Sequence, residues 1–463
     1  MLFNSWEYVL FLPLVVCCYY LLNYKYRWIL LLLASCIFYM YFIPKYILIL
    51  FLLIVIDYSA ALLIHRAKGV QRKMMLIVSI LANISLLAYF KYFTLAVDSL
   101  QEVFNWLHVA KTVPHWTIIL PIGLSFHTFQ SMAYTIEVYR GNQQPEKHLG
   151  IFSVYVLFFP QMVAGPIERF AALGNQLKQH HSFDLNNIIN GIRLIVFGLF
   201  IKMAVADQIA PLVDMIYSAP IQYNNLSVLT GMVLFSLQIY ADFWGYSTIA
   251  IGSAGMMGIT LMDNFKAPYL ATGISSFWNR WHISLSTWFK DYVYISLGGN
   301  RTSIIRWCST IFIVFALSGL WHGANWTFLV WGLIHASLYL IERFWTTLFP
   351  VTSNRFVICI SWLFTFLGVT IAWVFFRSHS FHQAFLILKQ LTIVNGYSLT
   401  LTWKVLLACF LFVSADIILA GKRFDHYIQH QPILVRWFMY TVLLFGITIM
   451  AAGEEQPFIY FQF

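Results

Sequence analysis

Residues 45–64 decide the fold: they read KYILILFLLIVIDYSAALLI, with Lys45 and Asp57 as the charged side chains of an otherwise apolar run. A helix that crosses the hydrocarbon core of a bilayer needs about 20 mostly apolar residues. Only helices and closed barrels can cross that core, because every backbone polar group must find a hydrogen-bond partner within the protein. The stretch therefore predicts a membrane-spanning helix.

Working outward from this stretch, similar apolar runs recur along the whole chain. They cover residues 8–22, 28–43, 74–93, 117–139, 188–206, 226–250, 307–321, 326–341, 356–376, 403–420 and 433–452. Residues 151–167 are also apolar, but Pro160, Gly165 and Pro166 interrupt them and favour a re-entrant or kinked element. We expect an all-α polytopic transmembrane protein with about eleven spans. It should form one membrane-embedded domain over 1–463, with its motif-bearing core at about 115–345 and its C-terminal spans at 356–452.

The composition excludes most other classes of protein. Of 463 residues, 60% are hydrophobic, 10% are charged and 18% are aromatic, whereas a soluble chain is about 45–50% apolar and about 25% charged. The six cysteines lie in or beside apolar runs without a CxxC pair, which favours packing over disulfides or a metal site. GxSxG, HExxH, Walker and GxGxxG motifs are absent, so a nucleophile or nucleotide fold of the soluble type is not expected.

The positions of basic residues predict the orientation in the membrane. The link 65–73 carries Arg66, Lys68, Arg72 and Lys73, and the link 23–27 carries two basic residues; neither link holds an acid. Short cytoplasmic links are enriched in Lys and Arg. Two crossings separate these links, so both are expected on the cytoplasmic side and the N-terminus outside.

Residues 262–306 form a basic and aromatic segment between apolar runs. Its apolar side chains recur at spacings of three and four, which predicts one helix face that carries Trp278, Trp281, Leu285, Trp288 and Tyr292. Polar residues lie mostly off that stripe. A basic amphipathic helix in the membrane interface is the expected structure, and a plain interfacial anchor is the alternative to a functional role.

The polar residue that most clearly suggests a functional site within an apolar stretch is His322. It lies in the stretch SGLWHGANW (318–326), and no charged residue occurs between Trp307 and His335. Glycines on both sides would let a ligand approach the backbone, and Trp321 could form a wall of a cavity. An uncharged imidazole can take a proton from a hydroxyl and pass it to a leaving thiolate. A hydrogen-bonded packing histidine is the alternative.

A second candidate is His282, in the stretch WNRWHIS (278–284). Asn279 lies three residues earlier and could share its helix face, while Arg280 or Lys290 could pair with a phosphate on an acyl donor. An interfacial histidine beside an arginine that reaches toward water is the alternative.

Two further polar residues stand in apolar runs. Asp242 could orient or charge-balance a histidine or Arg280, or it could hold two helices together. His335 is expected to face away from His322 and to have a structural role.

Longer motifs carry a resemblance to a known family. They are the run FWNRWHISLSTWF (277–289), the stretch SLGGNR (296–301) and the stretch GLWHGAN (319–325). Together with LPIGLSF (120–126), AGPI (164–167) and NFKAPY (264–269), they make the chain similar to the membrane-bound O-acyltransferase superfamily. Within it, the chain resembles the bacterial branch of alginate and peptidoglycan O-acetyltransferase membrane proteins.

The resemblance implies a funnel and a tunnel through which an acyl group from a cytoplasmic thioester reaches a hydroxyl on the other side. It places His322 at the family's essential histidine and His282 at a second histidine near the cytoplasmic mouth of the tunnel. Asn279, Arg280, Lys290, Asp242, Trp321 and Asn325 are candidate donor-binding or supporting residues.

On this basis the chain is expected to be an O-acetyltransferase of a bacterial inner membrane. Acetyl-CoA or another acyl thioester is the expected donor, without a bound cofactor, metal or nucleic acid. The expected acceptor is an extracytoplasmic polysaccharide, reached directly or through a partner acetyltransferase. A transporter or flippase that moves an acyl or glycan precursor without breaking a bond is the rival hypothesis, and a passive scaffold of a secretion complex is a third.

Overall fold

The computed structural model describes residues 1–109, 112–114, 116, 118, 120–163, 165–349, 354–451 and 458–461. Within these residues the regular structure is helical, apart from one isolated β-bridge between Tyr223 and Tyr397. The all-α prediction is therefore confirmed. Seven helical segments of this part of the chain are long and apolar enough to cross a membrane: Pro44–Arg66, Gly69–Trp106, Leu185–Ser218, Asn225–Gly255, Ile304–His322, Arg355–Arg377 and Ile433–Met450. The count of about eleven spans stays a prediction.

The chain divides into two compact units. The N-terminal unit comprises residues 1–188 and 253–262, and the C-terminal unit comprises residues 189–252 and 263–463. The division falls within α9 (Leu185–Leu199) and near the end of α11 (Asn225–Gly255). Whether the whole chain folds as one membrane-embedded domain stays a prediction.

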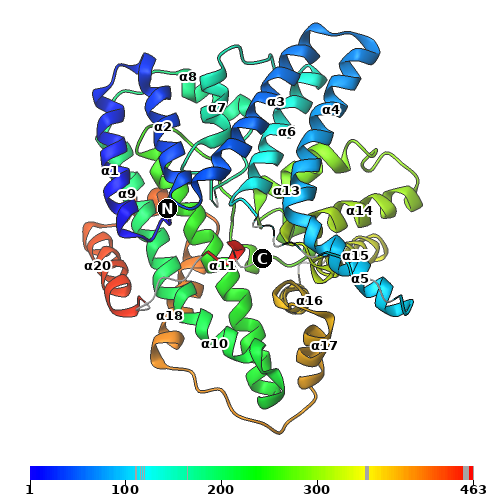
Figure 1. Cartoon of the computed structure of the whole chain (residues 1–463). Coiled ribbons are helices and arrows are strands. Elements are labelled where there is room, and N and C mark those ends of the chain that lie inside the picture. The colour runs from blue at the N-terminus through cyan, green and yellow to red at the C-terminus, as the bar shows by residue number, and fades with distance from the viewer. Residues whose placement is uncertain are drawn as a thin grey trace. The chain divides into compact units, whose positions relative to one another are not determined.

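The N-terminal unit is built from helices that pack side by side. Its α-helices are α1 (Trp6–Leu21), α2 (Arg27–Met40), α3 (Ile47–Arg66), α4 (Gly69–Leu87), α5 (Phe93–Trp106), α6 (Leu124–Arg140), α7 (Leu149–Leu157) and α8 (Phe170–Lys178). Figure 1 shows α3, α4 and α6 next to one another, and these three helices contact each other pairwise. The stretch that predicts a span, residues 45–64, forms the short 3₁₀ turn Pro44–Tyr46 and most of α3.

Buried hydrogen bonds to one carboxylate join these three helices. Asp57 of α3 is fully buried and accepts hydrogen bonds from Ser79 (2.6 Å) and Asn83 (2.9 Å) of α4 and from Ser131 (2.5 Å) of α6. Polar side chains that bond across helices hold membrane bundles together, because an unsatisfied polar group in hydrocarbon is costly. Asp57 therefore joins α3 to both of its neighbours.

The interrupted apolar run 151–167 is only partly helical. Helix α7 ends at Leu157, and residues 159–163 form turns around Pro160, which agrees with the break predicted from the prolines. Ala164, part of the stretch 164–167, lies outside the described residues. Residues 117 and 119 of the predicted run 117–139 and residue 452 of the predicted run 433–452 also lie outside the described residues. Helix α6 begins at Leu124, after Gly123 with φ of 74°.

Glu168 follows this break and is buried. It accepts a hydrogen bond from the backbone N–H of Met262 (2.6 Å), but burial raises the pKa of its carboxyl from 4.5 to about 7. The folded state therefore holds a proton that the unfolded state loses between pH 4.5 and 7. Over that range the unfolding free energy falls as the pH rises.

We expect Glu168→Gln to remove this pH dependence. The amide oxygen of glutamine can still accept the Met262 hydrogen bond, and no charge is buried above pH 7. The variant should be more stable than the parent chain at pH 8, by about 3 kcal/mol at most, and equally stable at pH 4.5. Thermal unfolding of the purified protein in detergent, followed by tryptophan fluorescence across this range, measures the difference. Parallel pH curves for the two proteins would contradict the expectation.

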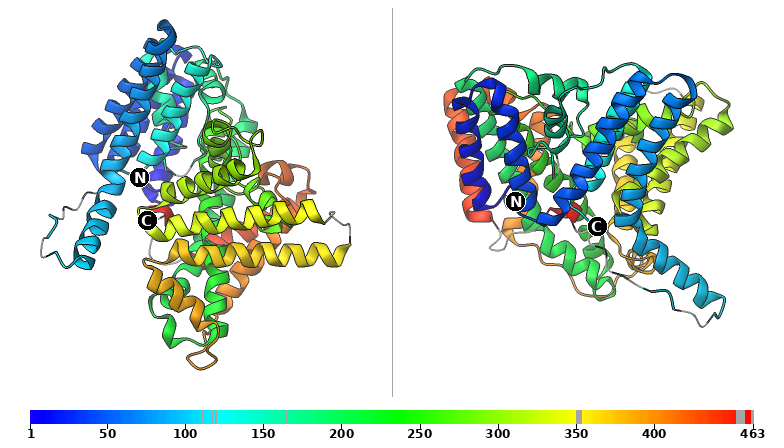
Figure 2. Two further views of the ribbon diagram at one scale, coloured as in Figure 1. Left: turned by 90° about the vertical axis from the view of Figure 1, so that its right-hand side faces the viewer. Right: turned by 45° about the horizontal axis from the view of Figure 1, so that its top comes forward.

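The C-terminal unit contains the remaining helices. They are α10 (Asp207–Ser218), α11, α12 (Ile274–Trp278), α13 (Ile283–Phe289), α14 (Ile304–His322), α15 (Trp326–Leu348), α16 (Arg355–Arg377), α17 (Phe381–Gln390), α18 (Trp403–Leu419), α19 (Phe424–Gln429) and α20 (Ile433–Met450). Two π-helical segments, η4 (Phe200–Ala206) and η7 (Lys290–Tyr294), follow α9 and α13. Figure 2 shows α15 and α16 side by side, and α15 also packs along α14.

The single amphipathic helix predicted over 278–292 is wrong. Helix α12 ends at Trp278, residues 279–282 form turns, and α13 begins at Ile283. The apolar stripe still faces inward, since Trp281, Leu285, Trp288 and Tyr292 are all buried. Apolar residues therefore keep a helical spacing across the break, because the residues on both sides of the turn are buried.

Candidate active site

The two histidines predicted from separate motifs lie next to each other in the C-terminal unit. The ring centroids of His282 and His322 are 6.4 Å apart, and both side chains are buried, with 0% and 5% of their surface exposed. Trp321 contacts both rings, at centroid distances of 6.0 and 4.9 Å. Forty sequence positions separate the two imidazoles, so the fold brings them together.

His282 occupies a conformation that is unusual for its residue type. Its φ of 41° and ψ of 55° place it in the left-handed region at the start of α13. Such a conformation costs of the order of 1–3 kcal/mol, and such residues cluster at functional sites. The backbone break at 279–282 therefore turns the His282 ring into the interior, where it packs edge-on against Phe243 at 4.6 Å.

Asn264 holds this turn in place. Its backbone oxygen accepts from the N–H of Ile283 (2.9 Å), and its side-chain oxygen accepts from the hydroxyl of Ser284 (2.7 Å). Its amide nitrogen donates to Ser247 of α11 (3.2 Å). Sequence reasoning did not select Asn264 as a site residue, although it opens the stretch 264–269.

His322 is the last residue of α14 and is enclosed by aromatic rings. Trp331 of α15 lies 5.1 Å from it, Phe376 of α16 lies 5.4 Å from it, and Tyr460 lies 5.6 Å from it, measured between ring centroids. Three helices and the C-terminal segment thus surround one imidazole. That Trp321 forms a wall of a cavity stays a prediction.

The glycines around His322 have a different role from the one predicted. A Cβ atom at Gly319 would collide with the backbone oxygen of Phe328, and one at Gly323 would collide with the Phe328 ring. Phe328 belongs to α15, so the two glycines let α14 and α15 pack closely. The expectation that they leave room for a ligand is therefore wrong.

The C-terminal segment packs against the histidine pair. Phe458 contacts Phe243 at 5.7 Å, and Tyr460 contacts both Phe243 (4.9 Å) and His322. The backbone N–H of Ile459 donates to Asp242 (2.6 Å). Sequence reasoning missed this segment; the aromatic residues of Phe458-Ile459-Tyr460 after the last apolar run were the available signal.

Asp242 belongs to a buried cluster of charges. Its carboxylate and that of Asp207 each pair with Lys202, at 2.8 and 2.7 Å, and all three side chains are at most 6% exposed. Lys202 lies in η4 and Asp242 in α11, so of the two interpretations of Asp242 the one in which it holds helices together is correct. Its carboxylate contacts Lys202 and the backbone N–H of Ile459, where Arg280 or a histidine was the expected partner.

The other predicted residues lie around this centre rather than in it. Asn279 is exposed while His282 is buried, so their expected common helix face is wrong. Arg280 is half-buried and donates to the backbone oxygen of Ala267 (3.5 Å), and Lys290 is exposed at the start of η7. Asn325 caps α15 by accepting from the N–H of Thr327 (3.0 Å).

His335 lies nearer to the site than expected. It is fully buried on α15, with Trp331 and Trp278 each 5.0 Å from its ring. Trp331 also contacts His322, so one tryptophan separates the two imidazoles. The surroundings of His335 are aromatic, which agrees with its predicted structural role.

The surroundings of His282 keep its imidazole uncharged. Burial lowers the pKa of His282 from 6.5 to about 3. A neutral imidazole offers one N–H donor and one nitrogen acceptor. Among the described residues, no group of three or more His, Cys, Asp and Glu side chains is placed to hold a metal ion. The centre can therefore offer proton transfer and hydrogen bonding at two adjacent imidazoles.

These features define the class: a multi-pass helical membrane protein with a buried histidine pair suited to acid–base chemistry. Residues 146–382, which include both histidines, match the model of MBOAT, the membrane-bound O-acyltransferase family. The chain belongs to the membrane-bound O-acyltransferase family, and it is accordingly an acyltransferase.

Three individual proteins show which acyltransferases the chain is similar to. The chain is 39% identical to the "Probable alginate O-acetylase AlgI" of Pseudomonas aeruginosa, over 81% of this chain and 71% of the relative. It is 35% identical to the peptidoglycan O-acetyltransferase of Helicobacter pylori, over 80% of this chain and 74% of the relative. It is 29% identical to the teichoic acid D-alanyltransferase of Bacillus subtilis, over 60% of this chain and 74% of the relative. The names of all three describe the transfer of an acetyl or D-alanyl group, with alginate, peptidoglycan and teichoic acid as the named polymers.

Proposed function

We propose that the chain moves an acetyl group from a cytoplasmic thioester to a hydroxyl of an extracytoplasmic polysaccharide, with His322 as the catalytic base. The observation that carries this proposal is the adjacency of His282 and His322 in a buried aromatic setting. The names of the relatives support acetyl transfer and a polymer acceptor. They favour it over transport without bond cleavage.

The proposed reaction is an acyl transfer between sulfur and oxygen. His322 takes the proton of the acceptor hydroxyl while the hydroxyl oxygen bonds to the thioester carbonyl carbon. The resulting tetrahedral intermediate breaks its carbon–sulfur bond, and the leaving thiolate receives the proton from the His322 imidazolium. General acid–base catalysis of this kind contributes about 10²–10⁴ in rate. A site from which water is excluded also prevents hydrolysis of the thioester.

His282 is proposed to stabilise the negative oxygen of that intermediate. A neutral imidazole can donate an N–H hydrogen bond, and donors that point at a developing oxyanion are worth more where water is excluded. The turn that Asn264 holds fixes the position of the ring. Fixed donors need no reorganisation during the reaction.

The donor is proposed to be acetyl-CoA or another acyl thioester, bound through the basic residues around 262–306. Arg280 and Lys290 are the proposed phosphate partners, and Asn279 is a proposed neighbour of the donor. Asn264 lines a cavity of about 30 Å³ whose lining also includes Asp263, Lys422 and Arg423; Arg423 is paired with Asp425 at 2.8 Å, which leaves Lys422 as a further proposed phosphate partner. Arginine and lysine both bind phosphate well.

The remaining assignments concern the location of the chain, its acceptor and the supporting residues of the site. We place the chain in a bacterial inner membrane with its N-terminus outside, because the links 23–27 and 65–73 are basic. The acceptor would be an alginate- or peptidoglycan-type polymer, reached directly or through an extracytoplasmic partner enzyme. Trp321 would form a wall of the site, and Asp242 and Asn325 would position the elements that carry it.

The experiment that tests the proposal uses the purified chain in proteoliposomes with acetyl-CoA that carries label in the acetyl group and in the CoA moiety. We expect free CoA to appear outside while labelled acetyl appears on an oligosaccharide acceptor enclosed inside. Appearance of both labels in the lumen without thioester cleavage would favour transport. The experiment is run once with an alginate oligosaccharide and once with a peptidoglycan oligosaccharide inside the vesicles. Absence of both cleavage and uptake in the two cases would refute the proposed donor.

The uncharged state of His282 leads to a prediction about pH. Because its pKa is about 3, the ring stays neutral over the whole range above about pH 5. We expect His282→Gln, which keeps an N–H donor, to retain more CoA release than His282→Ala, which should lose about 10²–10³-fold. CoA release, measured with a thiol reagent, should also depend on pH in the same way in the glutamine variant and in the parent chain between pH 5.5 and 8.5. A profile that loses an inflection in this variant would show that His282 titrates there instead.

A further inference from the structure

A second cavity lies in the N-terminal unit, far along the sequence from the histidine motifs. It has a volume of about 570 Å³ and is lined by Tyr58, Leu62, His65 and Arg66 of α3 and by Pro145 and Lys147 of the link 141–148. We call it the basic groove. Its size falls in the range of about 300–1,000 Å³ that is typical of small-molecule sites. Arg66 ends the candidate span Pro44–Arg66, so the groove opens where that span ends.

The charges that line the basic groove are all positive. Arg66 and Lys147 are exposed, and His65 beside them offers a further nitrogen. Within the part of the chain that the structure describes, no hydrogen bond or ion pair occupies the side chains of these three residues. Cations that protein carboxylates leave unneutralised attract anions. The groove thus presents unneutralised positive charge to solvent.

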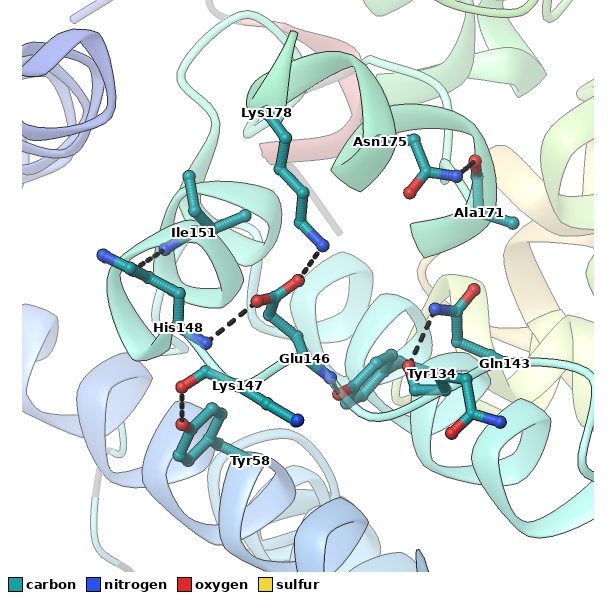
Figure 3. Close-up of polar contacts among 11 residues, drawn as sticks. Tyr58, Tyr134, Gln143, Glu146, Lys147, His148, Ile151, Ala171, Asn175 and Lys178 are labelled. Carbon is teal, nitrogen blue, oxygen red and sulfur yellow. Dashed lines mark hydrogen bonds and ion pairs between the residues drawn. The ribbon is translucent and has the colours of Figure 1, made fainter. Parts of the chain in front are cut away.

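The acid closest in sequence is directed away from the basic groove. Glu146, the single acid of the link 141–148, is buried; its carboxylate pairs with Lys178 and accepts from the N–H of His148 (2.9 Å). Figure 3 shows Glu146 pointing toward Lys178, whereas the backbone oxygen of Lys147 points toward Tyr58. The neighbouring Glu137 is paired with Arg140 at 3.3 Å. Both acids are therefore already neutralised.

The link that forms one wall of the basic groove is held at several points. The hydroxyl of Tyr58 donates to the backbone oxygen of Lys147 (2.6 Å), and the N–H of Glu146 donates to the hydroxyl of Tyr134 (2.7 Å). His148 caps α7 by accepting from the N–H of Ile151 (3.2 Å). These contacts, drawn in Figure 3, fix the backbone on either side of Lys147. A preformed wall lowers the ordering cost of binding.

We propose that the basic groove binds a phosphate group of a membrane-surface ligand. Arg66 and Lys147 would supply charge-assisted hydrogen bonds to the phosphate oxygens. Leu62 and Pro145 would cover the apolar part next to the phosphate. The phosphate can belong to the headgroup of an anionic phospholipid or to a soluble nucleotide, for which CoA serves as the probe; this site is separate from the donor site proposed at Arg280 and Lys290.

The test compares two double variants of the full-length chain that remove the same charge. Arg66→Gln with Lys147→Gln empties the basic groove of its fixed cations. Lys68→Gln with Lys73→Gln removes two exposed charges at the start of α4, where Lys68 is the N-cap residue, and neither residue lines the groove. All four side chains are exposed, so both proteins should elute and unfold as the parent chain does.

Two probes distinguish the sources of the phosphate. Purified protein is washed in detergent that contains phosphatidylglycerol, and the retained lipid is counted by native mass spectrometry; binding of labelled CoA is measured by equilibrium dialysis. At least a fivefold loss of retained lipid in the groove variant, with less than a twofold loss in the control, assigns the groove to a lipid headgroup. The same pattern for CoA alone assigns it to the nucleotide. Equal losses in both variants, or no loss in either, would overturn the proposal.

Discussion

Replacing His322 by alanine should leave a folded, membrane-inserted protein that releases CoA from acetyl-CoA about 10²–10⁴ times more slowly than the parent chain. The side chain is buried where the end of α14 meets Trp331 and Phe376. Without an imidazole there, no other group in the proposed reaction takes the proton of the acceptor hydroxyl. The loss should lie in kcat rather than in KM, because the base acts in the transition state and not in donor binding.

His335→Ala is the matched control for this variant. It also removes a buried imidazole that packs against Trp331, so both variants lose comparable packing. Their thermal midpoints should fall by similar amounts, whereas CoA release should fall less than tenfold in His335→Ala. Equal loss of activity in the two variants would assign His322 a packing role and would end the proposal that it is the base.

The sequence predicted the helices and the interruption at Pro160, but it did not predict the break at 279–282. Residues 45–64 and 226–250 each contain enough consecutive apolar residues to identify a helix without tertiary information. The break at 279–282 could not be found in this way, since Trp281 and Leu285 are buried on either side of the turn and keep the helical spacing. What breaks the helix is the pairing of the turn with Asn264, a contact between separate segments.

The candidate site was predicted in part. His282 and His322 were each selected from a local motif, and the adjacency of their rings agrees with a common site. The partner of Asp242 was not predicted, although Lys202 in the apolar run 188–206 was a signal, because charges in membrane spans usually pair with one another. The contact of Tyr460 with His322 depends on where the C-terminal segment folds back, and no local pattern encodes that.

The buried cluster of Lys202, Asp207 and Asp242 provides the second large effect. Lys202→Met should destabilise the protein by about 3–5 kcal/mol, because it leaves two buried carboxylates without their cation. The thermal midpoint of the purified protein in detergent measures this loss. Lys202→Met combined with Asp207→Asn and Asp242→Asn should recover much of it, since removing all the charges also removes their desolvation cost. A single variant as stable as the parent chain would contradict the role of the cluster.

Variants of Asp207 and Asp242 distinguish the contribution of the charge cluster to stability from its role in positioning the C-terminal segment 458–461. Asp207→Ala and Asp242→Ala each leave Lys202 with one partner, but only Asp242 also accepts the N–H of Ile459 (2.6 Å). We expect similar losses of thermal stability and a kcat that falls at least tenfold more in Asp242→Ala, because the segment that places Tyr460 against His322 loses its anchor. Tyr460→Cys in each background reports the release directly: maleimide should modify residue 460 faster beside Asp242→Ala, as quantified by peptide mass spectrometry. Equal kcat values and equal labelling rates would mean that Asp242 contributes only to stability and that the aromatic contacts of Phe458 and Tyr460 suffice to hold the segment.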